Sequence, residues 1–290
     1  MFASREAKEV ATILGQHSYL LLEEVHTAFE EAVVRCGSEV AFFRSLIQKL
    51  EDRLNNLRVP GISFRCRQVE IHQKPIVSGV FGSCELGDLL VVVKYHLVDF
   101  SVEAKSIIYQ AKMCDRGSHS CSIDQTQLEL LRNWPPFEFG RKRGGSRHLY
   151  TIQPKTVEFG SYMLEPRGAD PGDYLYRRTP FWPGPHPYYW WRSYGICPTA
   201  IQCQNEGPNR IDLRRFAPFM PDAWSIVDQI LFNRGEHHSN SPVATLVNAL
   251  YRYVGLDPDP PDEFEGFWKV PEDDGFAVLE INVTQTGGQE

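Results

Sequence analysis

The chain has 290 residues, of which 42% are hydrophobic and 23% charged, and its formal net charge is −7 at pH 7. This composition is typical of a globular protein and excludes a disordered or fibrous chain. The longest apolar run, residues 89–93, is far shorter than the roughly 18 residues of a membrane-spanning segment, so none is expected. The negative net charge argues against a protein whose whole surface binds nucleic acid. It is compatible with a local phosphate-binding patch.

The N-terminal segment, residues 1–15, carries charges where a secretion signal needs apolar side chains, so no such signal is expected. The seven cysteines are an odd number without regular spacing, which is typical of free thiols in a reducing compartment. Both features predict a cytoplasmic protein.

Two amphipathic helices are predicted near the N-terminus, over residues 18–35 and 39–57, because apolar residues recur there at helical spacing. Gly37 and Ser38 between them are typical of a helix end followed by a helix start. We expect the two helices to form an antiparallel hairpin or to pack on a sheet.

Short segments rich in Val and Ile follow, and they favour β-strands. The predicted strands cover residues 62–69, 76–81, 88–97 and 106–113. Because side chains alternate along a strand, Gln110 and Lys112 should share one face with Ile108, opposite the face that carries Ile107 and Tyr109. A polar pair is therefore expected on one side of an otherwise apolar strand.

The composition changes after residue 153. Residues 154–221 hold eleven of the twenty prolines and many aromatic residues, so regular structure should be sparse there. The remaining predicted elements are helices over residues 124–133, 223–233 and 241–254 and a strand over residues 276–282. We expect residues 1–153 to form a helical hairpin and an α/β core. Residues 154–290 should form an aromatic and proline-rich extension, packed on the core or folded as a second small domain.

An acidic residue and an amide–lysine pair lie on two successive predicted strands. Asp88 opens one strand, and Gln110 and Lys112 lie within the next. Facing side chains on neighbouring strands are only about 5 Å apart, so these groups can converge. Asp88 and Gln110 would offer oxygen ligands to a hard cation such as Mg²⁺, and Lys112 would orient or help to deprotonate an attacking water. Such a site suits phosphodiester hydrolysis. The alternative is structural: Asp88 caps a turn after Gly87, and the other two side chains face solvent.

This pattern resembles the PD-(D/E)xK nuclease superfamily, in the branch where Gln replaces the second acid. The resemblance covers residues 69–139 and consists of Glu-Leu-Gly-Asp at residues 85–88, an apolar strand, the QxK of residues 110–112 and a helix that begins near Asp124. It implies a restriction-endonuclease-like fold, which is an α/β core with a central mixed sheet flanked by helices. The N-terminal helices and the C-terminal extension would be added to that core.

The resemblance also implies the chemistry of the site. Asp88 would be the metal-binding acid, Gln110 the substitute for the second acid and Lys112 the catalytic lysine, with Mg²⁺ or Mn²⁺ as cofactor. Gln is a weaker metal ligand than Glu, so a further carboxylate is required. The candidates left open are Glu24, Glu31, Glu70 and Glu85.

A second ExK pattern, Glu103-Ala104-Lys105, lies upstream and is expected to precede the strand that carries Gln110. The densest basic cluster follows the predicted core and comprises Arg141, Lys142, Arg143 and Arg147. It is interpreted either as a sequence-independent phosphate contact or as a solvated turn.

These patterns together predict a metal-dependent hydrolase that cuts DNA, with RNA as the less favoured substrate. The family likeness suggests the effector of a bacterial anti-phage defence system, switched on by a protein partner encoded alongside it. A homo-oligomer is compatible with this interpretation, and no membrane partner is expected. The alternative is an inactive nuclease-like scaffold that binds a protein partner or nucleic acid.

Overall fold

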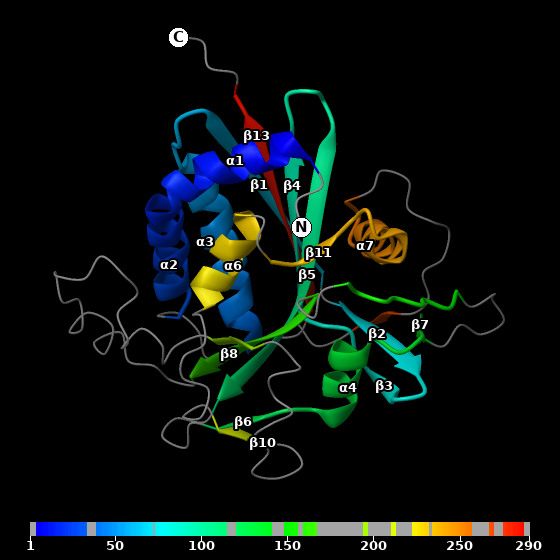
Figure 1. Cartoon of the computed structure of the whole chain (residues 1–290). Helices are drawn as coiled ribbons and strands as arrows, with labels where there is room; N and C mark the ends of the chain where they lie inside the picture. The colour runs from blue at the N-terminus through cyan, green and yellow to red at the C-terminus, as the bar shows by residue number, and fades with distance from the viewer. Residues whose placement is uncertain are drawn as a thin grey trace.

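The computed structural model places the chain around one central β-sheet (Figure 1). The structure describes residues 4–33, 39–71, 73–114, 120–140, 148–155, 159–166, 194–196, 210–212, 222–231, 234–256, 267–269 and 275–286. Within these residues the strand order of the central sheet is β1-β13-β4-β5-β8-β9, and β11 pairs with β5 outside that path.

The central sheet is mixed. Its strands are β1 (Ile62–Ile71), β4 (Leu89–His96), β5 (Val102–Cys114), β8 (Gly160–Pro166), β9 (Tyr194–Ile196), β11 (Glu236–His237) and β13 (Phe276–Gln285). Strand β13 runs parallel to β4, and β5 runs parallel to β8, whereas β4 and β5 are antiparallel. The expected α/β fold with a mixed sheet flanked by helices is confirmed at this level.

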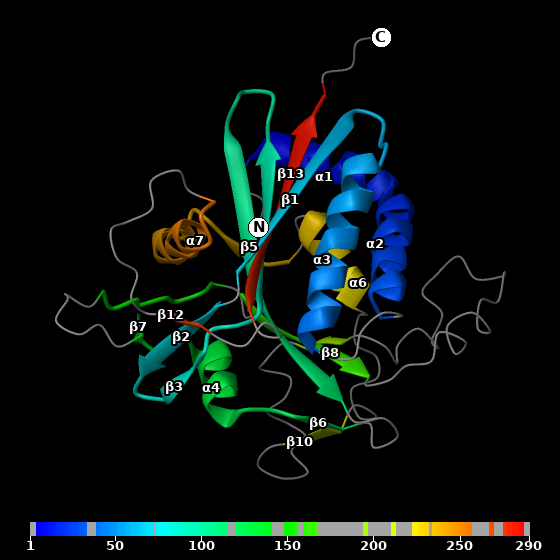
Figure 2. The same ribbon diagram turned by 180° about the vertical axis from the view of Figure 1, so that it is seen from behind.

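Helices cover both faces of the sheet (Figures 1 and 2). One face packs on α1 (Arg5–Gln16), α2 (Ser18–Val33), α3 (Glu39–Asn56) and α6 (Asp222–Ile230). The other face packs on α4 (Gln125–Asn133) and α7 (Ser241–Tyr253). The two hydrophobic cores therefore take alternate residues of the same strands, as Tyr109 in one and Ile108 in the other show.

Two smaller sheets complete the described fold. The first contains β12 (Phe267–Lys269), β2 (Gln73–Gly79), β3 (Gly82–Glu85) and β7 (Phe137–Phe139). The second pairs β6 (Ser120–Ser122) with β10 (Arg210–Asp212). Strands β2 and β3 form a tight hairpin that returns the chain to the start of β4.

The predicted N-terminal helices and most strands of the core are confirmed. The strand predicted over residues 76–81 ends at Gly79, where the chain turns into β3, and two further placements differ. The first is α1, which the sequence interpretation did not include. The second is β5, which begins at Val102, so Glu103 and Lys105 lie within the strand and not before it as expected. Both side chains are buried, and Oε2 of Glu103 accepts a hydrogen bond from Nε2 of His237 at 3.2 Å, because Nδ1 of that ring accepts from the N–H of Ser239.

The last strand, β13, lies in the middle of the sheet between β1 and β4. It is buried on both faces because Phe276 and Val278 enter one core while Ala277 and Leu279 enter the other. Strands β8 and β9 also come from beyond residue 154. The second half of the chain thus supplies strands to the same sheet as the first half.

Candidate functional site

Asp88 is held at the point where the β2–β3 hairpin enters β4. Its backbone N–H donates to the carbonyl of Tyr109 at 2.9 Å, and its carbonyl accepts from the N–H of Ala277 at 2.9 Å. The preceding Gly87 permits this close approach, because a Cβ there would lie 2.5 Å from Cγ2 of Ile108 and 3.0 Å from the oxygen of Tyr109. The backbone around Asp88 is therefore fixed between β5 and β13.

The structure brings Asp88 and Gln110 together, as the two-strand arrangement predicts. Oδ2 of Asp88 accepts from the backbone N–H of Ala111 at 2.7 Å and from Nε2 of Gln110. Lys112 lies two residues further along β5, and its charge acts on the Asp88 carboxyl. Gln110 is buried with 1% of its surface exposed, so it does not face solvent as the structural alternative required.

Lys74 is a member of this cluster that the sequence interpretation missed. Its Nζ lies 2.8 Å from Oε2 of Glu85 and 3.5 Å from Oδ1 of Asp88. Lys74 is buried on β2, and the hairpin register that pairs Ile76 with Glu85 brings it to the start of β4. A prediction of that hairpin register would have been needed to find it.

Gln127 holds Gln110 from the side of α4. Asp124 caps this helix by accepting from the N–H groups of Thr126 and Gln127 at 2.7 and 3.1 Å. The side-chain Nε2 of Gln127 then donates to Oε1 of Gln110 and, at 3.0 Å, to the carbonyl of Glu85. The predicted helix near Asp124 thus positions the amide of Gln110.

The pKa of Asp88 is raised to about 7, chiefly because burial disfavours the charged carboxylate. The positive charges of Lys74 and Lys112 and the hydrogen bond from Ala111 act in the opposite direction, while the charge of Glu85 raises the pKa further. The nearby cations therefore compensate the buried carboxylate only in part.

A small pocket of about 40 Å³ opens beside Asp88 between α3, β1 and β13. Its lining includes Glu70, Lys74, Asp88 and Ala111. That volume admits at least one water-sized group. Glu70 accepts a hydrogen bond from Nε of Arg44 and is the predicted carboxylate that shares this pocket with Asp88.

The two candidate metal-binding carboxylates on α2 lie elsewhere. Glu24 and Glu31 both accept hydrogen bonds from Arg53 between α2 and α3, at 2.7 and 2.5 Å. The hydrogen bond from Arg53 is the main reason that the pKa of Glu31 is lowered. These two carboxylates are thus engaged with Arg53, and neither lines the pocket beside Asp88.

The oxygen atoms around Asp88 fit a hard divalent cation only if the side-chain amide of Gln110 turns its oxygen toward the cation. Asp88 offers a carboxylate and Glu85 a second one, but Gln110 presents Nε2 to Asp88 and its oxygen to Gln127. Both amides would have to turn over for the Gln110 oxygen to face a cation. Among the described residues, no group of three or more His, Cys, Asp or Glu side chains is placed to hold a metal ion. A metal would therefore depend on amide and carbonyl oxygens as well as on Asp88.

The remaining predicted site residues lie apart from this cluster. Lys105 pairs with Val93, which lies five residues along β4 from Asp88. Because side chains alternate along β5, Lys105 and Gln110 point to opposite faces of the sheet. Arg141, Lys142, Arg143 and Arg147 lie outside the described residues.

Comparison with protein-family models, with curated proteins and with solved structures gives no match. Across the part of the chain that the structure describes, the helices are too short or too polar to cross a bilayer.

Proposed function

We propose that the protein is a metal-dependent nuclease whose site is built on Asp88, Gln110 and Lys112. The observation that carries the proposal is the direct contact between Asp88 and the Gln110–Ala111 segment of the next strand. The mixed sheet with helices on both faces is compatible with the restriction-endonuclease-like core that the sequence resembles. The raised pKa of Asp88 adds support, because perturbed carboxyl groups concentrate at functional sites.

We infer a role for each residue from the family resemblance and from its place in the cluster. Asp88 and Gln110, with Glu85 or Glu70, would hold Mg²⁺ or Mn²⁺. When bound, such an ion lowers the pKa of a water and stabilises charge on a phosphoryl group. Lys112 would orient the attacking water and balance negative charge as the phosphodiester is cut. Gln127 fixes the Gln110 amide and is a positioning residue.

DNA is the proposed substrate ahead of RNA, and a defence role with a co-encoded activating partner is the proposed context. Both rest on the family resemblance alone. A homo-oligomer is compatible with this function.

The test is cleavage of plasmid and linear DNA by the purified protein with Mg²⁺ or Mn²⁺. Wild type is expected to cut, and Lys112→Ala is expected to lose the activity. Lys8→Ala, which removes an exposed lysine on α1, is the matched control and should cut as wild type does. Equal cleavage by Lys112→Ala and wild type would show that the site is assigned to the wrong residues.

One observation favours a second candidate function, an inactive nuclease-like scaffold that binds a partner. Lys74 already supplies a cation between Glu85 and Asp88, where a metal would otherwise be needed. Thermal unfolding with Mn²⁺ separates the two functions, because an ion that binds only the folded state raises its stability. A shift that disappears in Asp88→Ala supports the nuclease. No shift, together with a stably co-purifying protein, supports the scaffold.

A further inference from the structure

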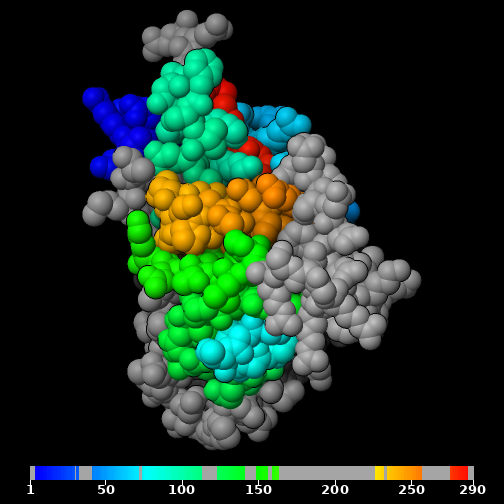
Figure 3. All heavy atoms as spheres, turned by 90° about the vertical axis from the view of Figure 1, so that its right-hand side faces the viewer, coloured from blue at the N-terminus to red at the C-terminus, as the bar shows by residue number. Residues whose placement is uncertain are grey.

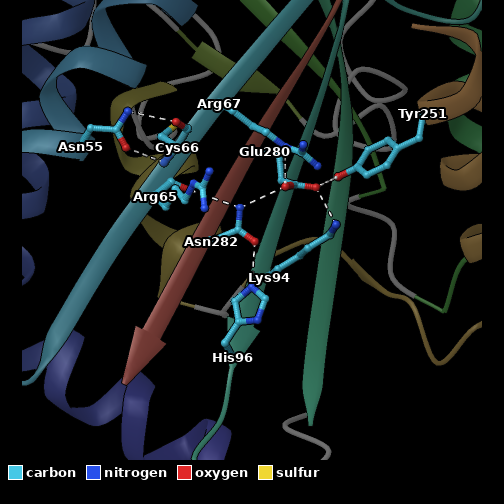
Figure 4. Close-up of polar contacts among 9 residues, drawn as sticks. All are labelled: Asn55, Arg65, Cys66, Arg67, Lys94, His96, Tyr251, Glu280 and Asn282. Carbon is cyan, nitrogen blue, oxygen red and sulfur yellow. Dashed lines mark hydrogen bonds and ion pairs between the residues drawn. The ribbon is translucent and has the colours of Figure 1, made fainter. Parts of the chain in front are cut away.

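Polar side chains form a grid on one face of β1, β13 and β4 (Figure 4). Residues that face each other across these strands form three rows. The rows are Ser63–Thr284–His96, Arg65–Asn282–Lys94 and Arg67–Glu280–Val92. Their neighbours Cys66, Ile281 and Val93 belong to the core on the α3 side, so the grid faces the α7 side.

Glu280 is the centre of the grid and is fully engaged (Figure 4). It accepts hydrogen bonds from Arg67 at 2.8 Å, from Tyr251 of α7 at 2.7 Å and from Asn282 at 3.0 Å, and it pairs with Lys94 at 2.5 Å. Burial alone would raise its pKa, but these partners lower it to about 2. One buried anion therefore fixes the positions of two cations.

The grid carries more positive than negative charge. Arg67 and Lys94 contact the single carboxylate of Glu280, and Arg65 lies in the next row beside Asn282, in a chain whose net charge is −7. The side chain of Arg67 is 47% exposed and that of Lys94 is 25% exposed, and Arg65 is exposed. Asn282 accepts from Nε2 of His96, because its oxygen can only accept. The surface is thus a local basic patch of the kind that binds phosphates.

The tip of the β4–β5 hairpin continues this face beyond His96. In the space-filling view this hairpin, β13 and β1 lie next to α7 on the same side of the molecule (Figure 3). Phe100 at the tip is 96% exposed and has a backbone φ of 65°. Phe100 thus adds an exposed ring at the end of the hairpin that also carries Lys94. Single-stranded nucleic acids bind surfaces that combine such rings, on which bases stack, with cations that hold the phosphates.

We propose that this face binds single-stranded nucleic acid, with phosphates on Arg65, Arg67 and Lys94 and one base on Phe100. The choice of nucleic acid among polyanions rests on the proposed nuclease function. The patch is distinct from the cleavage site, because Lys94 lies about 20 Å along β4 from Asp88 at roughly 3.3 Å per residue. A strand bound here would tether the substrate while another part of it reaches Asp88.

An anionic membrane is the competing partner for an exposed apolar tip beside basic side chains. Asp99 argues against it, because this exposed acid stands next to Phe100. Hydrogen bonds from the hydroxyl and backbone N–H of Ser101 lower its pKa, so the tip stays charged. The charge of Asp99 repels the phosphates of lipids and of nucleic acids alike, but only membrane binding requires the tip to insert into a bilayer, which a charged carboxylate opposes.

The experiment measures anisotropy of a fluorescein-labelled oligothymidine strand with EDTA present, so that binding is read without cleavage. Arg65→Ala should weaken binding several-fold and reduce the slope of log Kd against log salt by about one. Phe100→Ala should weaken binding by about tenfold with the slope unchanged. Arg5→Ala, on the exposed face of α1, is the matched control and should bind as wild type. Arg67 is left intact because its loss would strip a partner from Glu280.

The outcomes separate this proposal from the nuclease function. A wild-type protein that binds the strand but does not cut plasmid would overturn the nuclease function and leave this surface in place. Unchanged affinity in both Arg65→Ala and Phe100→Ala overturns the proposed surface, even if plasmid cleavage is normal. Binding of wild type to phosphatidylserine vesicles, lost in Phe100→Ala, with no binding of the oligonucleotide, would assign the face to a membrane and overturn the proposal.

Discussion

The ammonium of Lys74 lies 3.5 Å from Oδ1 of Asp88 and simultaneously 2.8 Å from Oε2 of Glu85. Two carboxylates from the β3–β4 connection thus share one internal cation. Lys74 and Asp88 have only 10% and 11% of their side-chain surface exposed, so solvent screens this pair weakly. The relationship explains how the two acids can lie close together.

Replacing Lys74 tests this relationship. Lys74→Met keeps the length of the side chain and removes its charge, so Asp88 and Glu85 would lose the cation that contacts both of them. We expect a loss of about 1–3 kcal/mol in the free energy of unfolding at pH 7.5, measured by urea titration. Under the nuclease proposal, Mn²⁺ should stabilise the variant more than wild type. Lys8→Met on α1 is the control, and equal stability of Lys74→Met and wild type would contradict a stabilising role for the pair.

Asp88 predicts a dependence of stability on pH. Its pKa is about 7 in the folded state and 3.8 ordinarily, so between these values the folded state holds a proton that the unfolded state has released. The contribution of Asp88 to stability is therefore present at low pH and is lost as pH rises from about 4 to 7, with a total on the order of 4 kcal/mol.

The measurement is urea unfolding of wild type and Asp88→Asn at several pH values without metal. The variant should gain stability relative to wild type as pH rises and stop gaining above pH 7. A constant difference between the two proteins across this range would show that the Asp88 carboxyl titrates normally.

Glu280 predicts the opposite trend. Its pKa is lowered to about 2 from 4.5, so its stabilisation is fully present above about pH 4.5 and is lost as pH falls toward 2. Glu280→Gln keeps the shape and removes the charge that Arg67 and Lys94 compensate. We expect the variant to be less stable than wild type by about 3 kcal/mol at neutral pH, and the difference should shrink on acidification. A difference that grows toward acid pH would contradict the ion network.

The core strands could be predicted from the sequence because their apolar pattern is local. The run at residues 89–93 is apolar and β-branched and therefore predicts a strand, which β4 is. The alternation around Gln110 also predicted correctly which neighbours share its face, since Ile108 and Tyr109 enter different cores. Asp88 and Gln110 were found because two successive strands that pair have few ways to place their side chains.

The remaining features depend on contacts between distant parts of the chain. The place of β13 between β1 and β4 follows from pairing over more than 180 residues, as between Asn282 and Lys94, which no local pattern encodes. Lys74 joins the site only through the register of the β2–β3 hairpin. Glu280 is likewise a single charged residue in an apolar strand, and its partners come from β1, β4 and α7.

Gly87 links the backbone to the chemistry of the site. A methyl group at this position would lie 2.5 Å from Cγ2 of Ile108 and 3.0 Å from the carbonyl oxygen of Tyr109, which accepts the N–H of Asp88. Gly87→Ala should therefore push the start of β4 away from β5, at a cost of about 1–3 kcal/mol in unfolding free energy. Gly15→Ala is the matched control, because nothing lies within 4 Å of its added Cβ on α1, and it should stabilise by about 0.5–1 kcal/mol.

Stability alone would not distinguish a displaced Asp88 from simple crowding, so the pH dependence supplies the second readout. If the displacement carries the Asp88 carboxyl toward solvent, burial no longer raises its pKa. The loss of stability between about pH 4 and 7 that wild type shows should then be reduced in Gly87→Ala and kept in Gly15→Ala. A variant that is destabilised but retains the full pH dependence would mean that Ile108 yields to the new methyl group and that Asp88 keeps its place.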